Sequence, residues 1–408
     1  MSETTRQQRH VVAACYLGWT LDAFDFFIMV FIIGDIAKEF GVDRTTVTWA
    51  ITLTLFLRAL GAYLFGRIAD RYGRRPTLMA NVLTYSVLEF ATGFAPTLTV
   101  FLILRALYGI AMGGEWGVGA SLTMESIPAR WRGTVSGLLQ AGYPSGYLLA
   151  TIVYRLFYGT GLVGWRGLFM IGVVPAILVF YIRRNVPESP DWERSSPANK
   201  EGDFVGVIRR HLPLAIYAVI LMTAFNFFSH GTQDLYPNFL QTAHHLDINQ
   251  VTTISIVANV GAIIGGLAFG TLSQHIGRRL AIVIAALLAL PIIPLWAFST
   301  TPVMIGLGAF LIQISVQGAW GVIPAHLNEI SPPDVRGTFP GLVYQLGNCF
   351  AAANATIQSA LAGAYFGGDL AWPLAAVAGI VAIVIAVLVG FGREAREVRM
   401  GRERVAAE

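Results

Sequence analysis

The stretch NFFSHGTQDLYPN, residues 226–238, places polar side chains inside an otherwise apolar segment. Asn226, His230 and Gln233 stand at positions i, i+4 and i+7, so a helix would carry them on one face, with Asp234 next to them. Amide and imidazole groups can hydrogen-bond a carboxylate and a neighbouring hydroxyl or keto oxygen. Because polar groups are costly to bury in lipid, we expect this face to line a water-accessible cavity that binds a small organic acid.

An organic acid that leaves water as an anion needs a fixed counter-charge. Two arginines, Arg58 and Arg105, lie inside apolar segments. An arginine stays charged when it is buried, and its planar fork matches a carboxylate. We expect Arg58 to bind the substrate. The competing interpretation is a structural ion pair, which a buried guanidinium needs anyway when the site is empty; its acidic candidates are Asp22, Asp25, Glu89 and Glu115.

Acidic side chains in the same apolar segments are candidates for proton coupling. A carboxyl group at membrane depth favours its neutral form because ionisation needs solvent, and a neighbouring arginine favours the charged form. A substrate that occupied the arginine would remove this second effect, so the carboxylate would take up a proton. His230 is open to another interpretation, a neutral hydrogen-bonding group that never titrates. The residues that we assign to proton coupling are Asp22, Asp25, Arg105, Glu115 and Asp234.

The segments that carry these residues are long enough to cross a membrane. The chain of 408 residues is 55% hydrophobic and 13% charged, with a mean hydropathy of +0.61. A helix needs roughly 20 apolar residues to span the hydrocarbon core. The sequence therefore predicts an all-α membrane protein with twelve transmembrane helices, and we expect no secretory signal peptide because the first apolar segment is a full-length span without a cleavage-like small-residue site. The predicted spans are 11–33, 46–68, 77–95, 98–121, 132–154, 165–183, 212–236, 251–273, 280–298, 302–324, 337–361 and 370–392.

Lys and Arg residues concentrate on alternate loops between these spans. They occupy the N-terminus, GRIADRYGRR, PARWRG, the 183–210 connection, HIGRR, PDVRG and the C-terminal tail. By the positive-inside rule, we expect a multi-pass protein of the cell membrane with both termini and the middle loop in the cytoplasm. Cysteine usage argues against a disulfide framework, because Cys15 and Cys349 fall inside predicted spans. The basic exceptions on the opposite loops are Lys38, Arg44, Arg155 and Arg166.

An internal repeat divides the chain into two halves. GRIADRYGRR begins at Gly66 and GTLSQHIGRR at Gly270, an offset of 204 residues, and the same offset relates ESIPARWRG at Glu125 to EISPPDVRG at Glu329. We therefore expect two pseudo-symmetric six-helix bundles with a binding site between them at the membrane midplane. The predicted parts are an N-terminal bundle at 1–183, a cytoplasmic linker at 184–210, a C-terminal bundle at 211–393 and a basic cytoplasmic tail at 394–408.

The loop between the second and third spans resembles a known signature. Residues 66–75 spell G-x-x-x-D-R-x-G-R-R, which is similar to the loop 2–3 signature of the major facilitator superfamily. The resemblance implies the twelve-helix fold of that superfamily and a gating role for Asp70, Arg71, Arg74 and Arg75. Asp70 would bind arginines or the N-terminus of a neighbouring helix in one state and release them in the other. The alternative is that the arginines are positive-inside anchors with no part in gating.

The seventh span narrows the resemblance. N-x-x-S-H-x-T-Q-D, from Asn226 to Asp234, is similar to the signature of lactate and pyruvate permeases among the metabolite:proton symporters, although that pattern continues with Thr where this chain has Asn238. The resemblance implies a proton-coupled symporter of a small monocarboxylate such as lactate or pyruvate. The alternatives are a symporter of a sialic or aromatic acid, a drug:proton antiporter and a non-transporting receptor. Arg105 and Gly109 also match the superfamily's R-x-x-x-G pattern, which implies proton coupling in the fourth span.

Two further groups of residues are expected to act in the transport cycle. At the cytoplasmic helix ends, we expect salt bridges Glu125–Arg132 and Glu329–Arg336 that stabilise an outward-facing state; simple helix-end charges are the alternative. Cavity residues are expected from the fifth span and from its partner, the eleventh. These candidates are Gln140, Tyr143 and Asn348.

Motifs of soluble enzymes do not occur in the sequence. We find no Walker A motif, no G-x-G-x-x-G motif, no His/Cys metal spacing and no nucleophile elbow. We therefore expect a protein that is not an enzyme and uses no cofactor or metal. Its expected partners are a small organic anion, a proton and the lipid bilayer, with no nucleic acid, and we expect a monomer.

Overall fold

The structure is a computed structural model that describes residues 3–194 and 204–395. The middle of the predicted linker and most of the predicted tail therefore lie outside the described residues. Within the described residues the chain is helical and contains no strand. All twelve predicted spans are helical, and nine helical stretches of the described chain are long and apolar enough to cross a membrane by themselves.

Each span is one helix or a pair of consecutive helices. In the N-terminal half these are α1 (Glu3–Phe31), α3 (Arg44–Tyr72), α4 (Arg74–Thr92), α5 with α6 (Leu98–Gly113, Glu115–Ser126), α7 with α8 (Arg132–Gln140, Gly142–Val153) and α9 with α10 (Trp165–Ile171, Ala176–Asn185). In the C-terminal half they are α14 with α15 (Leu212–Gln233, Tyr236–Thr242), α16 (Ile248–Ile276), α17 with α18 (Arg278–Leu287, Ala289–Phe298), α19 (Pro302–Ile330), α20 with α21 (Phe339–Ala351, Asn354–Tyr365) and α22 (Ala371–Gly390). Short helices outside the spans are α2 (Ile33–Phe40), the π-helical turn η2 (Tyr154–Tyr158), α11 (Pro190–Arg194) and α13 (Phe204–Arg210).

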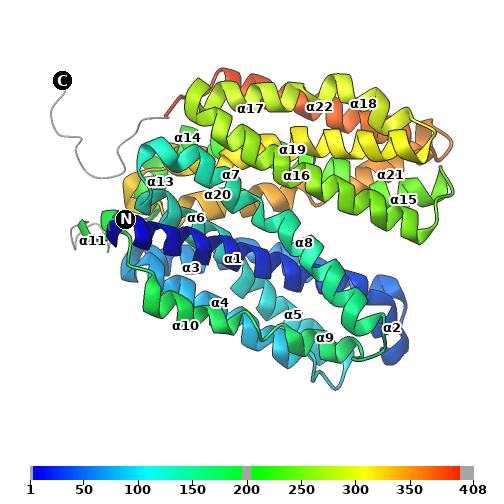
Figure 1. The fold of residues 1–408 in the computed structure, drawn as a ribbon, viewed down its shortest axis with the longest axis horizontal. Helices are drawn as coiled ribbons and strands as arrows, with labels where there is room; N and C mark the ends of the chain where they lie inside the picture. Colours follow the sequence, from blue (N-terminus) through cyan, green and yellow to red (C-terminus); the bar gives the residue numbers. More distant parts are fainter. Residues whose placement is uncertain (1–2, 195–203, 396–408) are drawn as a thin grey trace.

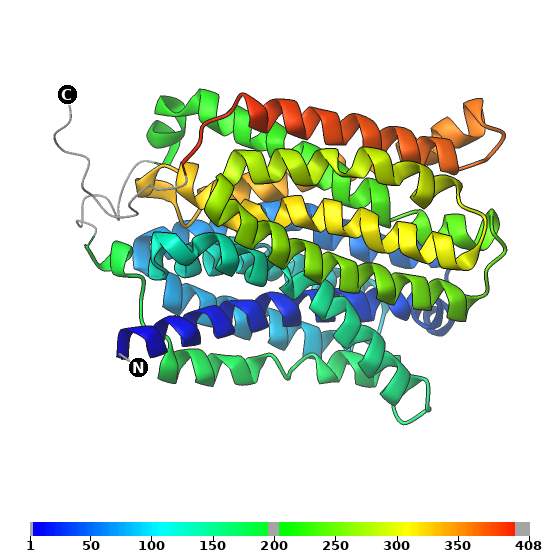
Figure 2. The ribbon, with the colours of Figure 1, turned by 45° about the horizontal axis from the view of Figure 1, so that its top comes forward.

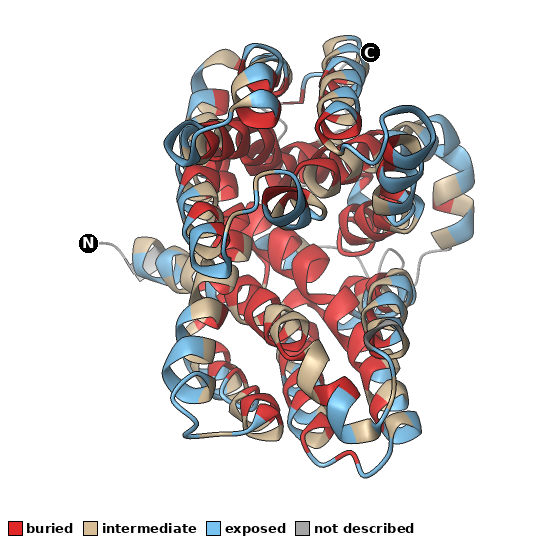
Figure 3. Cartoon of the chain, turned by 90° about the vertical axis from the view of Figure 1, so that its right-hand side faces the viewer, coloured by how far each residue is buried: buried red, intermediate tan, exposed pale blue. Residues whose placement is uncertain are grey.

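The two halves form two bundles whose long helices run side by side (Figures 1 and 2). Helix α1 begins and α22 ends at the same end of the molecule, which we call the terminal end; the other end, which carries α2, α9 and α15, we call the far end (Figure 1). Seen from the far end, buried residues gather in the centre of the molecule and exposed residues on its periphery (Figure 3). The exposed residues include large hydrophobic side chains such as Phe56, Ile177 and Phe180, as expected of a surface that faces lipid.

The repeat found in the sequence recurs in the packing of the helices. A Cβ atom on Gly61 of α3 would lie 1.8 Å from the carbonyl oxygen of Ile110 in α5, and a Cβ on Gly265 of α16 would lie 2.4 Å from that of Ile314 in α19. The two pairs are related by the 204-residue offset. Glycine at these positions lets the helix backbones approach closely, which stabilises packing where lipid supplies no hydrophobic driving force.

At the terminal end, two symmetry-related contacts join the bundles. The carboxylate of Asp70 accepts hydrogen bonds from the Gly337 N–H at 2.8 Å and from the Thr338 hydroxyl at 2.5 Å. In the other half, the side-chain oxygen of Gln274 accepts a hydrogen bond from the Gly133 N–H at 2.9 Å. Asp70 and Gln274 are related by the repeat, and so are Gly337 and Gly133. These contacts close the terminal end, so a cavity between the bundles must be reached from the far end.

The glycine contact yields a test of the packing. We expect Gly61→Val to lower the midpoint of thermal unfolding, because overpacking a filled contact typically costs about 1–3 kcal/mol. Gly363→Val serves as the control, since a Cβ at Gly363 of α21 meets no atom within 4 Å. The measurement is thermal unfolding of the purified proteins in detergent, and equal midpoints for the two variants would contradict the role of Gly61.

Candidate functional site

A cavity of about 1070 Å³ lies between the two bundles. Its lining comes from both halves of the chain, with α1, α3 and α8 on one side and α14, α16, α19 and α20 on the other. Residues near the far end, such as Arg155 and Asn249, line it together with residues halfway along the spans, such as Arg58 and Asn226. The cavity therefore runs from the far end to the middle of the molecule.

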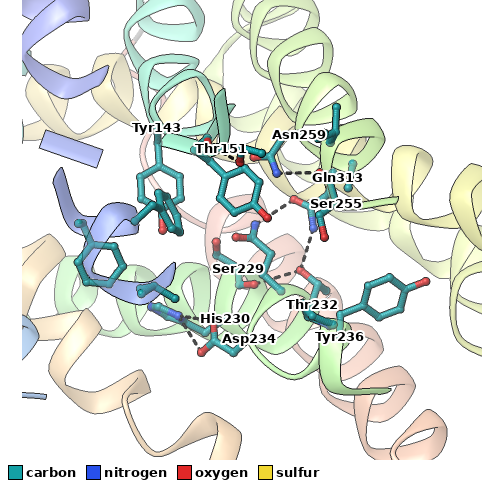
Figure 4. A pocket seen from close by; sticks show the side chains of 18 of the residues that line it. Tyr143, Thr151, Ser229, His230, Thr232, Asp234, Tyr236, Ser255, Asn259 and Gln313 are labelled. Atoms are coloured by element: carbon teal, nitrogen blue, oxygen red, sulfur yellow. Dashed lines mark hydrogen bonds and ion pairs between the residues drawn. The ribbon is translucent and has the colours of Figure 1, made fainter. Parts of the chain in front are cut away.

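The polar face of the seventh span lies on the cavity wall, as expected. His230 is held at both ring nitrogens: Nδ1 lies 3.1 Å from the Asp234 carboxylate, and Nε2 lies 2.9 Å from Oδ1 of Asn348 (Figure 4). Asn226 Nδ2 donates to the Met222 carbonyl oxygen at 2.8 Å. All of these side chains except Met222 line the cavity. The imidazole and its partners therefore form a fixed polar wall.

The amide of Gln233 is fixed by a residue that the sequence analysis did not single out. Its Nε2 donates to Oε1 of Gln313 in α19 at 2.9 Å, so its own oxygen is left as an acceptor. Gln313 lines the cavity, as do Gln317 in the same helix and Ser255 and Asn259 in α16. These residues could have been found from the sequence, because each is a polar side chain within an apolar span. The same pattern identified the polar face of the seventh span.

The two buried arginines have different surroundings. Arg58 lines the cavity, and its Nη2 lies 3.1 Å from the Asp22 carboxylate. Its Nε has no hydrogen-bond partner among the described residues, so the guanidinium has donor capacity left. Arg105 is 1% exposed, does not line the cavity, and pairs with Glu89 inside the N-terminal bundle. The geometry therefore gives Arg58, but not Arg105, access to a ligand.

A glycine places Arg58 close to the fourth span. A Cβ on Gly113, the last residue of α5, would lie 2.1 Å from the carbonyl oxygen of Arg58. The span is interrupted directly after this contact, at Gly114, before α6 begins with Glu115. This close approach puts the Glu115 carboxyl group in the same buried layer as Arg58 and Asp22.

Two carboxyl groups of this layer have no partner. All four carboxylate oxygens of Asp25 and Glu115 are buried and lack a hydrogen-bond donor among the described residues. An ionised carboxylate in such a place is costly, so burial favours the neutral, protonated form. The four buried carboxyl groups of this region face only two guanidiniums, so two of the acids have no counter-charge. The acids are Asp22, Asp25, Glu89 and Glu115, and the guanidiniums are those of Arg58 and Arg105. The Asp234 carboxyl group differs from these buried acids, because it lines the cavity and its side chain is 41% exposed.

The remaining cavity candidates also line it. Gln140 accepts a hydrogen bond through Oε1 from the Trp116 indole N–H at 3.2 Å, which turns its NH₂ group away from Trp116. Tyr143 stacks on Trp19 with ring centroids 5.8 Å apart. Asn238, where the chain departs from the permease pattern, is exposed and does not line the cavity.

The gating candidates gather at the terminal end, but two expected pairings are wrong. Glu125 pairs with Arg74 at 3.0 Å instead of Arg132, and Glu329 pairs with Arg278 at 3.0 Å instead of Arg336. Nε of Arg132 donates to the Met124 carbonyl oxygen and Nε of Arg336 to that of Asn328. Arg74 and Arg278 begin α4 and α17, in the span that precedes each glutamate, and each reaches its glutamate side-on through Nε and Nη2. These two arginines therefore take the place that we expected for Arg132 and Arg336.

The arginines of the 66–75 signature lie in different surroundings. Arg74 also lies 3.2 Å from Asp70, which it holds against the opposite bundle. Arg75 donates to the carbonyl oxygen of Arg183 within the N-terminal bundle. Arg71 is exposed, and its guanidinium lies 5.3 Å from the ring of the neighbouring Tyr72. Asp70 therefore contacts the opposite bundle directly and Arg74 contacts Asp70, whereas Arg71 lies at the surface.

Comparisons with known proteins agree with this architecture. The family model of the Major Facilitator Superfamily matches residues 15–353 and 219–406 of this chain. The "Carboxylic acid transporter protein homolog" of Saccharomyces cerevisiae is 31% identical over 374 residues, which are 86% of this chain and 61% of the yeast protein. The "Sialic acid transporter NanX" of Escherichia coli is 28% identical over 389 residues, 94% of each chain. This chain thus spans less than two thirds of the yeast relative's length.

The fold is also that of solved transporters. The crystal structure of the proton:xylose symporter XylE superposes with a TM-score of 0.79 at 16% identity, covering 97% of this chain and 98% of XylE. At this identity the likeness concerns the fold alone. The chain belongs to the Major Facilitator Superfamily and is a membrane-embedded, multi-pass transporter, not an enzyme.

Proposed function

We propose that this chain is a proton-coupled symporter of a small monocarboxylate such as lactate or pyruvate. The observation that carries the proposal is Arg58, a guanidinium on the cavity wall whose recorded partner is the Asp22 carboxylate, 3.1 Å away. The names of the yeast and bacterial relatives, which refer to carboxylic and sialic acid transport, support an organic acid as substrate. Both names describe carboxylates, which is the chemistry that an arginine fork binds best.

Substrate binding follows from the free donors around the cavity. The carboxylate of the substrate takes the place of Asp22 on the Arg58 guanidinium. The amide oxygens of Asn226 and Gln233 then accept a hydrogen bond from a hydroxyl next to the carboxylate, beside the fixed His230 imidazole. The Gln140 NH₂ group, which is turned away from Trp116, donates to a keto oxygen at the same place. A small acid held in this way keeps its charge paired throughout, which avoids the cost of an isolated ion in a low-dielectric site.

Proton coupling follows from the loss of the ion pair. When the substrate occupies Arg58, Asp22 loses its partner inside the buried layer and takes up a proton. Asp25 and Glu115 are buried near Asp22 and lack hydrogen-bond partners in the described chain. We propose that their carboxyl groups also carry protons. Co-entry of one proton makes the step electroneutral, whereas the anion alone would be opposed by about 2.3 kcal/mol per 100 mV of negative interior potential.

Alternating access is the third part of the proposal. Positive-inside loops put the terminal end in the cytoplasm of a cell-membrane protein, so the cavity faces outward in this structure. Release inward requires the contacts of Asp70 and Gln274 with the opposite bundle to separate. We propose that the pairs Arg74–Glu125 and Arg278–Glu329 stabilise the bundle ends that carry these contacts. A single chain contains the complete path, so the proposal needs only a monomer.

A larger acid with a flat or ring-shaped body is the second candidate. The N-terminal wall of the cavity is rich in aromatic rings, among them Trp19, Phe27, Tyr143 and Tyr147. Lactate leaves most of a 1070 Å³ cavity to water, whereas a ring-shaped acid would contact this wall. The proton chemistry at Arg58 and Asp22 is the same for both candidates.

The role of Arg58 is tested by substitution. We expect Arg58→Gln to abolish uptake of radiolabelled lactate or pyruvate into proteoliposomes, because removing one partner of a buried charge pair costs about 2–5 kcal/mol, or roughly 30-fold to several-thousand-fold in affinity. Arg58→Lys keeps the charge without the fork and should retain a fraction of the activity. Uptake by Arg58→Gln at the wild-type rate and half-saturation concentration would remove Arg58 from the site.

The role of Asp25 is tested by separating exchange from accumulation. We expect Asp25→Asn to catalyse exchange of labelled for unlabelled substrate but to lose accumulation driven by an inward proton gradient, because exchange needs no net proton movement. Asp43→Asn, which changes an exposed aspartate outside the cavity, is the matched control and should accumulate normally. Normal accumulation by Asp25→Asn would show that this carboxyl group carries no coupled proton.

The two substrate candidates are separated by competition. Lactate, pyruvate, benzoate and sialic acid are added in turn to proteoliposomes that take up labelled lactate. We expect lactate and pyruvate to inhibit at lower concentrations than the two larger acids. The reverse order, with benzoate or sialic acid inhibiting most strongly, would favour the second candidate and contradict a preference for small monocarboxylates.

A further inference from the structure

Arg155 is a basic side chain for which the proposed transport chemistry gives no role. It is one of the basic residues that break the positive-inside pattern at the far end. Of the others whose side chains are described, Arg166 pairs with Glu39 at 2.7 Å, and this contact holds the pKa of the Glu39 carboxyl below its usual value. Lys38 lies in the last turn of α2, where a cation is favoured by the helix dipole. Arg155 is left without such an explanation.

The position of Arg155 points to a ligand. It lies in η2, directly after α8, and it lines the same cavity as Arg58. The side chain is exposed, and no ion pair joins it to another described residue. The nearby acid Asp35 accepts a hydrogen bond from Tyr158, and together with Lys38 it lines a smaller, adjoining cavity that shares Val30, Phe31 and Tyr154 with the main one. The Arg155 charge is therefore available in the main cavity.

A contact between the bundles crosses this cavity partway along its length. The Tyr147 side chain in α8 hydrogen-bonds Ser255 in α16, and both residues line the cavity. Tyr143 stands one turn before Tyr147 on α8 and Asn259 one turn after Ser255 on α16, both toward the terminal end, whereas Thr151 stands one turn after Tyr147 toward the far end. Because a helix rises 1.5 Å per residue, Arg155 stands about 12 Å from Tyr147 and about 18 Å from Tyr143 along α8.

We propose that Arg155 forms an outer binding subsite for the substrate's carboxylate, separated from the Arg58 chamber by the Tyr147–Ser255 contact. This inference rests on the proposed transport of an organic anion. Asn249 and Thr252 at the start of α16 and Gln241 in α15 line the same cavity and supply uncharged hydrogen-bonding groups at its far end. An exposed cation in the mouth of a cavity raises the local concentration of anions and speeds their association.

An aromatic wall connects the two subsites. Ring contacts run without a gap from Tyr154, next to Arg155, to Trp19, next to Arg58, with centroid distances between 4.9 and 5.8 Å. The rings in order are Tyr154, Phe31, Tyr147, Phe27, Tyr143 and Trp19. This wall offers no charge that could hold the anion between the two arginines. The carboxylate therefore passes from one guanidinium to the other with no intermediate ionic trap on this side.

The experiment measures association rates. Full-length protein in lipid nanodiscs is mixed with lactate or benzoate in a stopped-flow instrument, and tryptophan fluorescence reports binding at about 10 mM and about 1 M ionic strength, where the screening length is about 30 Å and about 3 Å. We expect Arg155→Gln to lower the association rate constant roughly three- to tenfold at low ionic strength and to match the wild type at high ionic strength. Arg155→Lys should keep most of the rate, because it keeps the charge.

Lys38→Gln is the matched control, since it removes an exposed cation at the same end but outside the main cavity, and it should leave the rate unchanged. A rate constant for Arg155→Gln equal to that of the wild type at low ionic strength would overturn the outer subsite. So would a loss of the same size at both ionic strengths, because that pattern indicates a packing effect. Binding of neither acid to the wild type would instead refute the proposed function, and the subsite with it.

Discussion

A guanidinium inside a membrane protein needs an anionic partner at every stage, and this constraint governs the arrangement around Arg58. An arginine remains protonated when it is buried, so its charge cannot be removed to lower the cost of desolvation. In the structure its partner is Asp22. A substrate carboxylate can replace that partner only if the charge of Asp22 is removed at the same time. We propose that this exchange of partners links an anion to a proton without any further energy source.

The two halves of the chain divide the work between them. The packing of the helices is shared by the two halves. The glycine contacts repeat, and Thr97 and Thr301 cap the N-termini of α5 and α19, which are in the fourth span of each half. The ionisable residues buried halfway along the spans do not repeat. Asp22, Asp25, Arg58, Glu89, Arg105 and Glu115 of the N-terminal half correspond by the 204-residue offset to Asn226, Ser229, Ala262, Ile293, Ala309 and Ala319 of the C-terminal half. The N-terminal bundle thus holds these buried mid-span charges, and the C-terminal bundle presents amides, a hydroxyl and His230 to the cavity.

The fold and the cavity face of the seventh span could be predicted from the sequence, because both follow from local patterns. Span length, the 204-residue repeat and the spacing of Asn226, His230 and Gln233 need no knowledge of tertiary contacts. Ion-pair partners could not be predicted in the same way. Glu125 has basic residues within reach on several helices, and helix approach decides that Arg74 is the one that pairs with it.

Two further features depended on three-dimensional packing. From the sequence we expect Arg58 to bind the substrate and Arg105 to act in proton coupling, but which of the two reaches the cavity depends on packing. Arg105 pairs with Glu89 inside the N-terminal bundle, whereas Arg58, whose main chain Gly113 approaches closely, lines the cavity. Gln313 and Ser255 were passed over because an isolated amide or hydroxyl in an apolar span is a weak signal until its neighbours are known. Their contacts with Gln233 and Tyr147 come from helices far apart in the sequence.

The exchange of partners at Arg58 is tested most directly by counting protons. Isothermal titration calorimetry of substrate binding, repeated in buffers with different enthalpies of ionisation, gives the number of protons taken up for each anion bound. The proposed coupling between Arg58, Asp22 and the substrate predicts an uptake of about one proton near neutral pH. Binding of the anion with no net proton uptake would mean that Asp22 keeps its charge when the substrate arrives, and it would contradict the coupling.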